Sequence, residues 1–105
     1  MTKSTDGKAR ELTTEQRKHL KALAHDLKPV VMIGAHGLTD AVIGEADRAL
    51  AAHELIKVRV LGDDRQARES HLAGLCAALG AAPVQHIGKL LLIYRPADKP
   101  KIHLP

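Results

Sequence analysis

The residues with the clearest chemical potential are two glycines that flank two other residues: Gly34, Ala35, His36 and Gly37. Glycine adopts positive φ freely and has no side chain, so a nucleic-acid backbone can approach the main-chain N–H groups of such a turn. A helix is expected to start at Thr39, and the N–H groups at a helix N-terminus attract phosphate. The same residues also suit a plain strand-to-helix turn with an exposed His36. This tetrapeptide alone does not decide between the two interpretations.

A second set of candidates is basic and falls on or beside predicted strands. Lys57 and Arg59 alternate with apolar residues, so both side chains are expected on one strand face. Each cation could bind phosphate, although charged residues on an outer strand face are more often simply solvated. The formal net charge of +4 and a pI near 9.5 also favour a polyanionic partner. The set is Lys28, Lys57, Arg59, Lys89 and Arg95.

The aromatic content restricts how RNA could be bound. Tyr94 is the only aromatic residue in the chain. Modules that stack bases on aromatic side chains, such as the RRM and the OB-fold, are therefore disfavoured. Any RNA binding would depend on the backbone, charge and shape of the protein.

Residues for catalysis or metal binding do not occur at productive spacings. The seven histidines include no pair four residues apart, which is the spacing of a helical zinc site. Ser70 and His71 are neighbours, and adjacent residues on a helix do not face each other. The sequence contains neither a phosphate loop with a following Lys-Ser or Lys-Thr nor a G-x-S-x-G elbow. We therefore expect no enzymatic activity and no metal, cofactor or small-molecule site.

The single cysteine and the hydropathy pattern predict a location. Cys76 lies among leucines, where we expect it to pack in the core, and it cannot form an internal disulfide. No apolar run approaches the roughly 20 residues of a membrane helix, and the N-terminus lacks the apolar segment of a signal peptide. These features predict a soluble cytoplasmic protein without a membrane partner.

The first predicted helix has a clear start and a clear end. Thr13 and Gln16 fit a capping box, and Lys28 should be the last residue because Pro29 disfavours helical geometry before it. Its apolar stripe consists of Leu20, Leu23, Ala24 and Leu27.

Two further helices are predicted from caps and stripes. One follows Thr39, and the other follows Asp63 or Asp64 and ends at Gly80. Apolar residues recur along one face of each helix. Two arginines near the start of the third helix, Arg65 and Arg68, are expected on a solvated face.

Four strands complete the pattern. Residues 30–33 are apolar and predict a buried strand, whereas residues 55–61 alternate between apolar and basic. Residues 84–87 and 90–94 flank Gly88-Lys89, which is the spacing of a two-residue hairpin with glycine first. The resulting order predicts an α/β fold, a two-layer α-β-α-β-α-β-β domain with a mixed four-stranded sheet. The last strand is expected inside the sheet and the third at an edge.

The chain length of 105 residues fits a single domain. Residues 1–12 have no periodicity and are expected to form a flexible basic arm. The domain itself is expected over residues 13–105, and we expect it to be a monomer.

Three separated segments resemble one known family. They are LKALAHDLKPVVMIGAHGLTDAVIGEADRALAAHELIKVRV, VQHIGKLLLIYRP and KIHLP, so the similarity extends from about Thr13 to Leu104. The segments resemble the CRM domain, named for chloroplast RNA splicing and ribosome maturation, and in particular its stand-alone bacterial YhbY-like members. The resemblance implies a fold like the C-terminal domain of translation initiation factor three, with strand order 1-2-4-3.

The resemblance also implies a function. It predicts a ribosome-assembly factor that binds ribosomal RNA in large-subunit precursors through the GxxG loop and nearby basic residues. KH-type loops often carry Lys or Arg between the glycines, where this chain has Ala35 and His36. Part of the binding charge must then come from the five basic residues named above. The alternative is a module that docks to a ribosomal protein without touching RNA.

Overall fold

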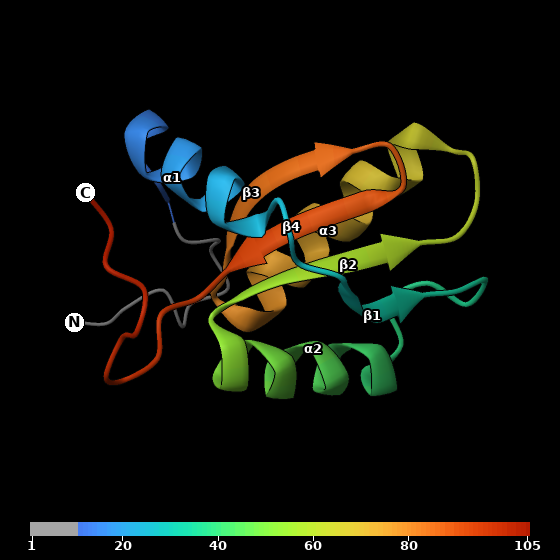
Figure 1. Ribbon diagram of the computed structural model, residues 1–105. Helices are drawn as coiled ribbons and strands as arrows, with labels where there is room; N and C mark the ends of the chain where they lie inside the picture. The colour runs from blue at the N-terminus through green and yellow to red at the C-terminus, as the bar shows by residue number, and fades with distance from the viewer. Residues whose placement is uncertain (1–10) are drawn as a thin grey trace.

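The computed structural model describes residues 11–105, which form three helices and four strands in the predicted order (Figure 1). Residues 1–10, most of the predicted flexible arm, lie outside the described residues. The elements are α1 (Thr14–Ala24), β1 (Pro29–Ile33), α2 (Asp40–His53), β2 (Leu55–Val60), α3 (Arg65–Leu79), β3 (Ala82–Ile87) and β4 (Leu90–Tyr94).

The four strands form one mixed sheet of order β1-β2-β4-β3, which confirms the predicted α/β class and strand order. β2 runs parallel to β1 and antiparallel to β4, and β4 runs antiparallel to β3. The β3–β4 hairpin turns at Gly88 and Lys89, and Gly88 has φ 55, as a glycine-first turn requires. Helices α2 and α3 cover one face, and α1 adds a partial third layer on the other (Figure 1).

Capping residues start the helices as predicted. Thr13 Oγ1 accepts a hydrogen bond from the Gln16 N–H at 3.0 Å, and Gln16 Oε1 accepts one from the Thr13 N–H at 3.1 Å. Thr39 caps α2, and Asp64 rather than Asp63 caps α3. Each cap satisfies N–H groups that would otherwise have no partner in the first helical turn.

Helix α1 ends at Ala24, one turn before the end predicted at Lys28. The Leu27 N–H donates to the Ala24 carbonyl at 3.0 Å, so the backbone tightens into a turn. Leu23 and Leu27, expected on the buried stripe, are 44% and 37% exposed. Because this end of the helix faces little of the core, packing does not stabilise another helical turn.

The larger hydrophobic cluster lies between the sheet and the helices α2 and α3. Cys76 belongs to it and is fully buried, which confirms its predicted place in the core. Burial raises the pKa of the Cys76 thiol to about 12, so the thiol is inert at neutral pH. The cluster contains Val31, Ile33, Ala46, Leu50, Ile56, Val58, Val60, Leu75, Cys76, Ala81, Leu91 and Ile93.

A smaller cluster lies on the opposite face, under α1. Its buried members are Leu20, Ala24, Leu55, Val84, Leu92 and Tyr94. Ile102 and Leu104 from the C-terminal segment pack against it. Figure 1 shows that α1 covers only the end of the sheet at which β2 begins, so the other end of this face is open.

The strand β1 is exposed on one side, contrary to the prediction of a buried strand. Val31 and Ile33 are buried, whereas Val30 and Met32 are 49% and 52% exposed. The physical reason is that β1 is an edge strand and α1 packs on β2, β3 and β4 instead. A continuous apolar run therefore did not mean burial on both faces.

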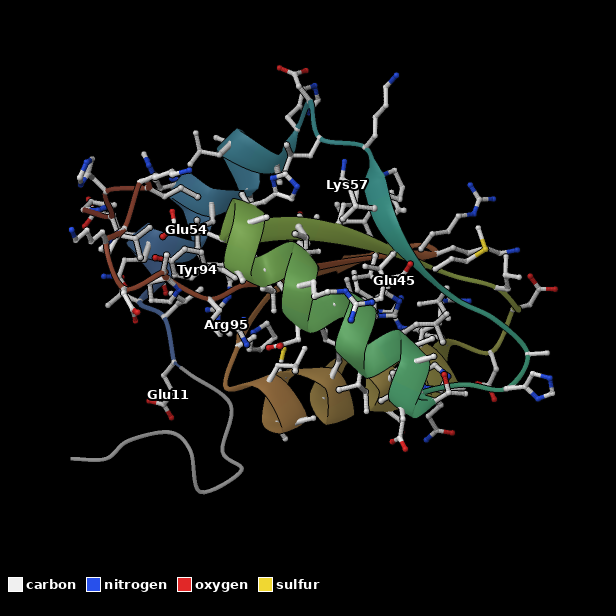
Figure 2. The ribbon with its side chains drawn as sticks, turned by 90° about the horizontal axis from the view of Figure 1, so that it is seen from below. Glu11, Glu45, Glu54, Lys57, Tyr94 and Arg95 are labelled. Carbon is white, nitrogen blue, oxygen red and sulfur yellow. The ribbon has the colours of Figure 1, made fainter. Side chains whose placement is uncertain are left out.

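The side chain of Glu54, between α2 and β2, holds the C-terminal segment against the domain (Figure 2). Glu54 is 2% exposed and has φ 68, a left-handed backbone that is uncommon for this residue type. Its carboxylate accepts hydrogen bonds from the N–H groups of Ala97 at 2.7 Å and of Lys101 and Ile102 at 2.9 Å. Burial alone would raise the pKa of this carboxyl, but the three N–H donors and the Lys101 charge hold it below its ordinary value.

We predict that Glu54→Gln lowers the free energy of unfolding by about 1–3 kcal/mol at pH 7, because an amide oxygen accepts weaker hydrogen bonds than a carboxylate. The native pKa of Glu54 lies below the unfolded one, so the carboxylate's contribution is complete above the unfolded pKa. It is lost as the pH falls through the native pKa. Urea unfolding of parent and variant at pH 7 and pH 3 measures both effects.

The exposed Asp98 provides a control on the same segment. Asp98→Asn should change the free energy of unfolding by less than about 0.5 kcal/mol at either pH. If Glu54→Gln and the parent differed in free energy of unfolding by the same amount at pH 7 and pH 3, this role of the carboxylate would be contradicted.

Candidate nucleic-acid interface

The GxxG loop, residues 34–37, forms a closed turn directly after β1. The Gly37 N–H donates to the Gly34 carbonyl at 3.0 Å, and Gly37 has φ 72. Ala35 and His36 at the tip of the turn are exposed. The loop therefore presents its two middle side chains, and the main chain around them, to solvent.

The two glycines of the loop have different surroundings. A Cβ at Gly37 would lie 3.3 Å from Cε1 of His71 on α3, whereas nothing lies within 4 Å of a Cβ at Gly34. The positive φ at residue 37 therefore favours glycine, and a larger residue there would also displace His71. Gly34 has open space around it, which leaves room for a ligand to approach the main chain.

The start of α2 adds N–H donors next to the loop. Thr39 Oγ1 accepts a hydrogen bond from the Val42 N–H at 3.2 Å. Within residues 11–105, no hydrogen bond uses the N–H groups of Asp40 or Ala41. These free donors and the helix dipole favour an anion. The exposed Asp40 carboxylate would repel an anion placed directly at the N-terminus of α2. A phosphate is therefore favoured on the side of the GxxG loop.

Arg59 lies at the same end of the sheet as the GxxG loop. It pairs with Met32 on β1 and with Leu90 on β4, and Met32 is two residues before the loop. The predicted register is confirmed, because Lys57 and Arg59 alternate with buried residues of the larger cluster. Those buried residues are Ile56, Val58 and Val60. Arg59 therefore lies on the part of the sheet that α1 leaves open.

Lys89 lies at this same end, in the turn of the β3–β4 hairpin. Its carbonyl accepts a hydrogen bond from the Val60 N–H at 2.8 Å, which joins the hairpin to the end of β2. Its Nζ is 3.1 Å from Asp63 Oδ1, and the two side chains are 46% and 95% exposed. Such an exposed ion pair contributes little stability, so a phosphate can replace the carboxylate. The GxxG loop, Arg59 and Lys89 together form what we call the loop end of the sheet.

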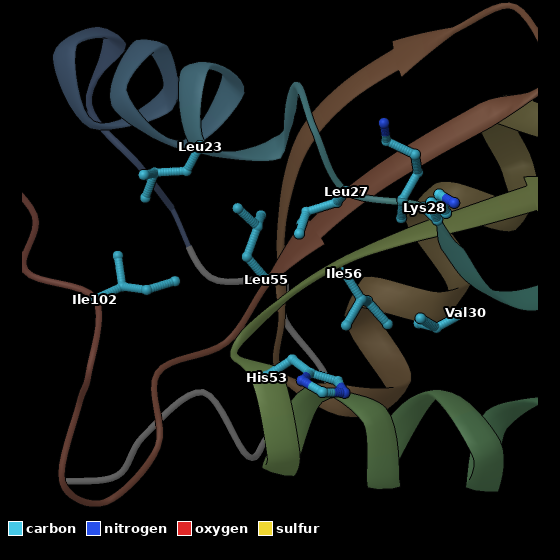
Figure 3. A pocket seen from close by; sticks show the side chains of 9 residues that line it. Leu23, Leu27, Lys28, Val30, His53, Leu55, Ile56 and Ile102 are labelled. Carbon is cyan, nitrogen blue, oxygen red and sulfur yellow. The ribbon is translucent and has the colours of Figure 1, made fainter.

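Lys28 and Lys57 lie further from the loop, near the start of β1. Lys57 pairs with Pro29, which directly follows Lys28. Both lysines line a pocket of about 400 Å³ between α1, β1 and the end of α2 (Figure 3). Along β2, Lys57 is two residues from Arg59, a separation of about 7 Å.

Arg95 is not brought together with the other candidates. Its guanidinium donates to Asp47 Oδ1 at 2.8 Å and to the Leu79 and Asp47 carbonyls at 3.1 Å each. These contacts join the end of β4 to α2 and α3, on the face opposite α1 (Figure 2). In this position Arg95 connects elements of the core.

Comparison with known proteins identifies the family. The family model of the CRS1 / YhbY (CRM) domain matches residues 12–95. The chain belongs to this family. An RNA-binding protein of Haemophilus influenzae is 48% identical over 94 residues, which cover 90% of this chain and 95% of that protein. A protein of Pseudomonas aeruginosa named as a probable RNA-binding protein is 45% identical over 93 residues, 89% of each chain.

The CRM fold is also found in a solved structure. A Staphylococcus aureus protein that has been suggested to bind RNA has a TM-score of 0.80 against this CRM domain. The two are 34% identical, and the similarity covers 90% of this chain and 100% of the other. The resemblance predicted from the three sequence segments is thereby confirmed.

The positions of two residues near the loop end of this CRM domain were not predicted from the sequence. His71 was considered as a metal ligand and as a neighbour of Ser70, but its ring lies beside Gly37, where Cε1 would be 3.3 Å from an added Cβ. Arg68, expected on a solvated face, is only 9% exposed and donates to the Gly62 carbonyl at 3.1 Å. The neighbouring residues, Gly37 for His71 and Gly62 for Arg68, both lie in loops outside α3. Helical periodicity could therefore not predict either position.

Two further findings concern the described part of the CRM domain. Residues 11–105 contain no group of three or more His, Cys, Asp or Glu side chains placed to hold a metal ion. In the same range, no helix has the length and apolar character needed to cross a membrane.

We predict that Gly37→Ala lowers the free energy of unfolding by about 1–2 kcal/mol, because φ 72 is unfavourable for a residue with Cβ and His71 must shift. Gly34→Ala is the matched variant and should change it by less than about 0.5 kcal/mol. Chemical denaturation of both variants measures the difference. Equal destabilisation by the two substitutions would show that this account of the loop is wrong.

Proposed function

We propose that this CRM domain is a non-enzymatic RNA-binding protein that associates with ribosomal RNA in large-subunit precursors and assists their assembly. The observation that carries the proposal is the position of the exposed GxxG loop beside Arg59, on a part of the sheet that none of the helices in residues 11–105 covers. The names of the Haemophilus and Pseudomonas relatives, which state RNA binding, support it.

In this proposal the loop binds the RNA backbone rather than the bases. The open space at Gly34 lets a phosphate reach main-chain N–H groups, and the start of α2 supplies the helix dipole. KH domains use a GxxG loop in a comparable way. Ala35 and His36 bring no fixed positive charge, so backbone donors provide the contact at the loop itself.

Arg59 and Lys89 supply positive charge next to the loop, whereas Lys57 and Lys28, also predicted to contact RNA, lie further away beside the pocket at the start of β1. Tyr94, the only Phe, Tyr or Trp of the chain, is 3% exposed in the smaller cluster, so it is not available for base stacking. Binding by charge and shape without stacking fits recognition of structured RNA such as ribosomal RNA. Arg95 was among the predicted contacts, and we now propose that its role is to hold α2, α3 and β4 together.

The proposal also covers the location, oligomeric state and target of the protein. We expect it to act in the cytoplasm as a monomer, without a cofactor, on precursor particles of the large ribosomal subunit.

We predict that the double variant Ala35→Asp, His36→Asp loses at least about tenfold in affinity for ribosomal RNA, while the fold is retained. Both side chains are exposed, so the change should cost little stability. A phosphate at the loop would meet two carboxylates, and each like-charge contact at about 4 Å costs roughly 1–4 kcal/mol, depending on the dielectric. Filter binding to large-subunit RNA, circular dichroism and gradient sedimentation of cell extracts measure affinity, folding and particle association.

A matched control adds the same two charges away from the loop. Ala51 and Ala78 are exposed near the C-terminal ends of α2 and α3. Ala51→Asp with Ala78→Asp should keep the affinity within about threefold of the parent, because only the long-range charge term changes. If the loop variant and this control bound RNA equally well, the loop would have no part in binding.

A further inference from the structure

The pocket at the start of β1 is lined mainly by aliphatic side chains. It has a volume of about 400 Å³ and opens beside the edge of the sheet (Figure 3). Leu23, Leu27 and Val30 on its wall are 44%, 37% and 49% exposed, and exposed apolar side chains that lie together often mark an interaction site. The other aliphatic lining residues are Leu55, Ile56 and Ile102. A cavity of this kind fits a branched apolar side chain.

Positive charge borders this pocket. Lys28 and Lys57 both line it, and neither forms an ion pair with any residue between 11 and 105. His53 lies on the side of α2. A partner segment that inserts an apolar side chain here would therefore gain from neighbouring carboxylates.

The adjacent edge of β1 offers backbone hydrogen bonds. The Ile33 carbonyl accepts from the Leu61 N–H at 2.9 Å, so Ile33 directs its backbone groups towards β2. Backbone direction alternates along the regular part of a strand, and β1 is regular from Val31 to Ile33. Met32 therefore directs its N–H and carbonyl groups to the open edge. An extended peptide can pair with these groups and place alternate side chains towards the pocket.

We propose that the β1 edge and this pocket bind an extended acidic segment of a partner protein. The segment adds a strand beside β1, inserts one aliphatic side chain into the pocket and places carboxylates against Lys28 and Lys57. RNA fits this position less well, because most of the lining is aliphatic and a nucleotide cannot add a strand to a sheet edge. The inference goes beyond RNA binding, because the GxxG loop lies at the other end of β1, about 16 Å away.

In the test, random decapeptides displayed on phage are selected against the immobilised full chain, and phage that bind the bare support are removed. We expect the enriched peptides to carry Asp or Glu beside Leu, Ile or Val. A synthetic copy of an enriched peptide should bind Val30→Asp at least tenfold more weakly than the parent. It should bind Ile87→Asp within twofold, because Ile87 is equally exposed, at 51%, but lies on the opposite edge strand. N-methylation of alternate peptide amides should abolish binding.

A charge variant keeps the test valid if Val30→Asp does not fold. Lys28→Glu with Lys57→Glu alters only side chains at the rim and should weaken the acidic peptide at least tenfold. The proposal is overturned if no selected peptide distinguishes the parent from both variants, or if Ile87→Asp weakens binding equally. It is also overturned if single-stranded oligouridine, rather than a peptide, shifts the methyl resonances of Leu27 and Ile56, since the pocket would then be an RNA site.

Discussion

A four-stranded sheet has two faces to cover, and this chain has only three helices within its described residues with which to cover them. Helices α2 and α3 enclose one face completely, which leaves the 11-residue α1 for the other. At 1.5 Å per residue such a helix is about 16 Å long, too short to extend over the whole sheet. The open part of that face, with Arg59 and the GxxG loop beside it, is the consequence of this shortage.

The covered part of that face depends in turn on Glu54. Its carboxylate positions the C-terminal segment, whose Ile102 and Leu104 complete the cluster under α1. The same segment also places Ile102 in the wall of the apolar pocket. One buried carboxylate with three N–H donors therefore stabilises the α1 layer and shapes one of the two surfaces that we propose for binding. Near the other surface, at the loop end, Arg68 donates to the Gly62 carbonyl and His71 lies beside Gly37.

Local signals in the sequence predicted much of this structure because the forces behind them act over a few residues. The capping box at Thr13, the hairpin at Gly88-Lys89 and the alternation around Lys57 are all confirmed. The errors came where distant parts of the chain decide the outcome. Whether Val30 and Met32 are buried depends on where α1 lies, and Arg68 is buried by the turn at Gly62 and the hairpin. Nothing local distinguished Glu54 from a surface carboxylate, or Arg95 from a phosphate ligand. The contact roles of the loop and the lysines remain predictions.

The central claim is that RNA contacts this CRM domain at the loop end of the sheet. Ultraviolet crosslinking of the protein to RNA in purified large-subunit precursor particles, with mass-spectrometric identification of the crosslinked residues, tests it most directly. The account predicts RNA adducts on residues 34–37 and on the peptide that carries Arg59, with none on the outward faces of α2 and α3. Adducts confined to those helix faces, or particles that carry the protein without any RNA adduct, would contradict it.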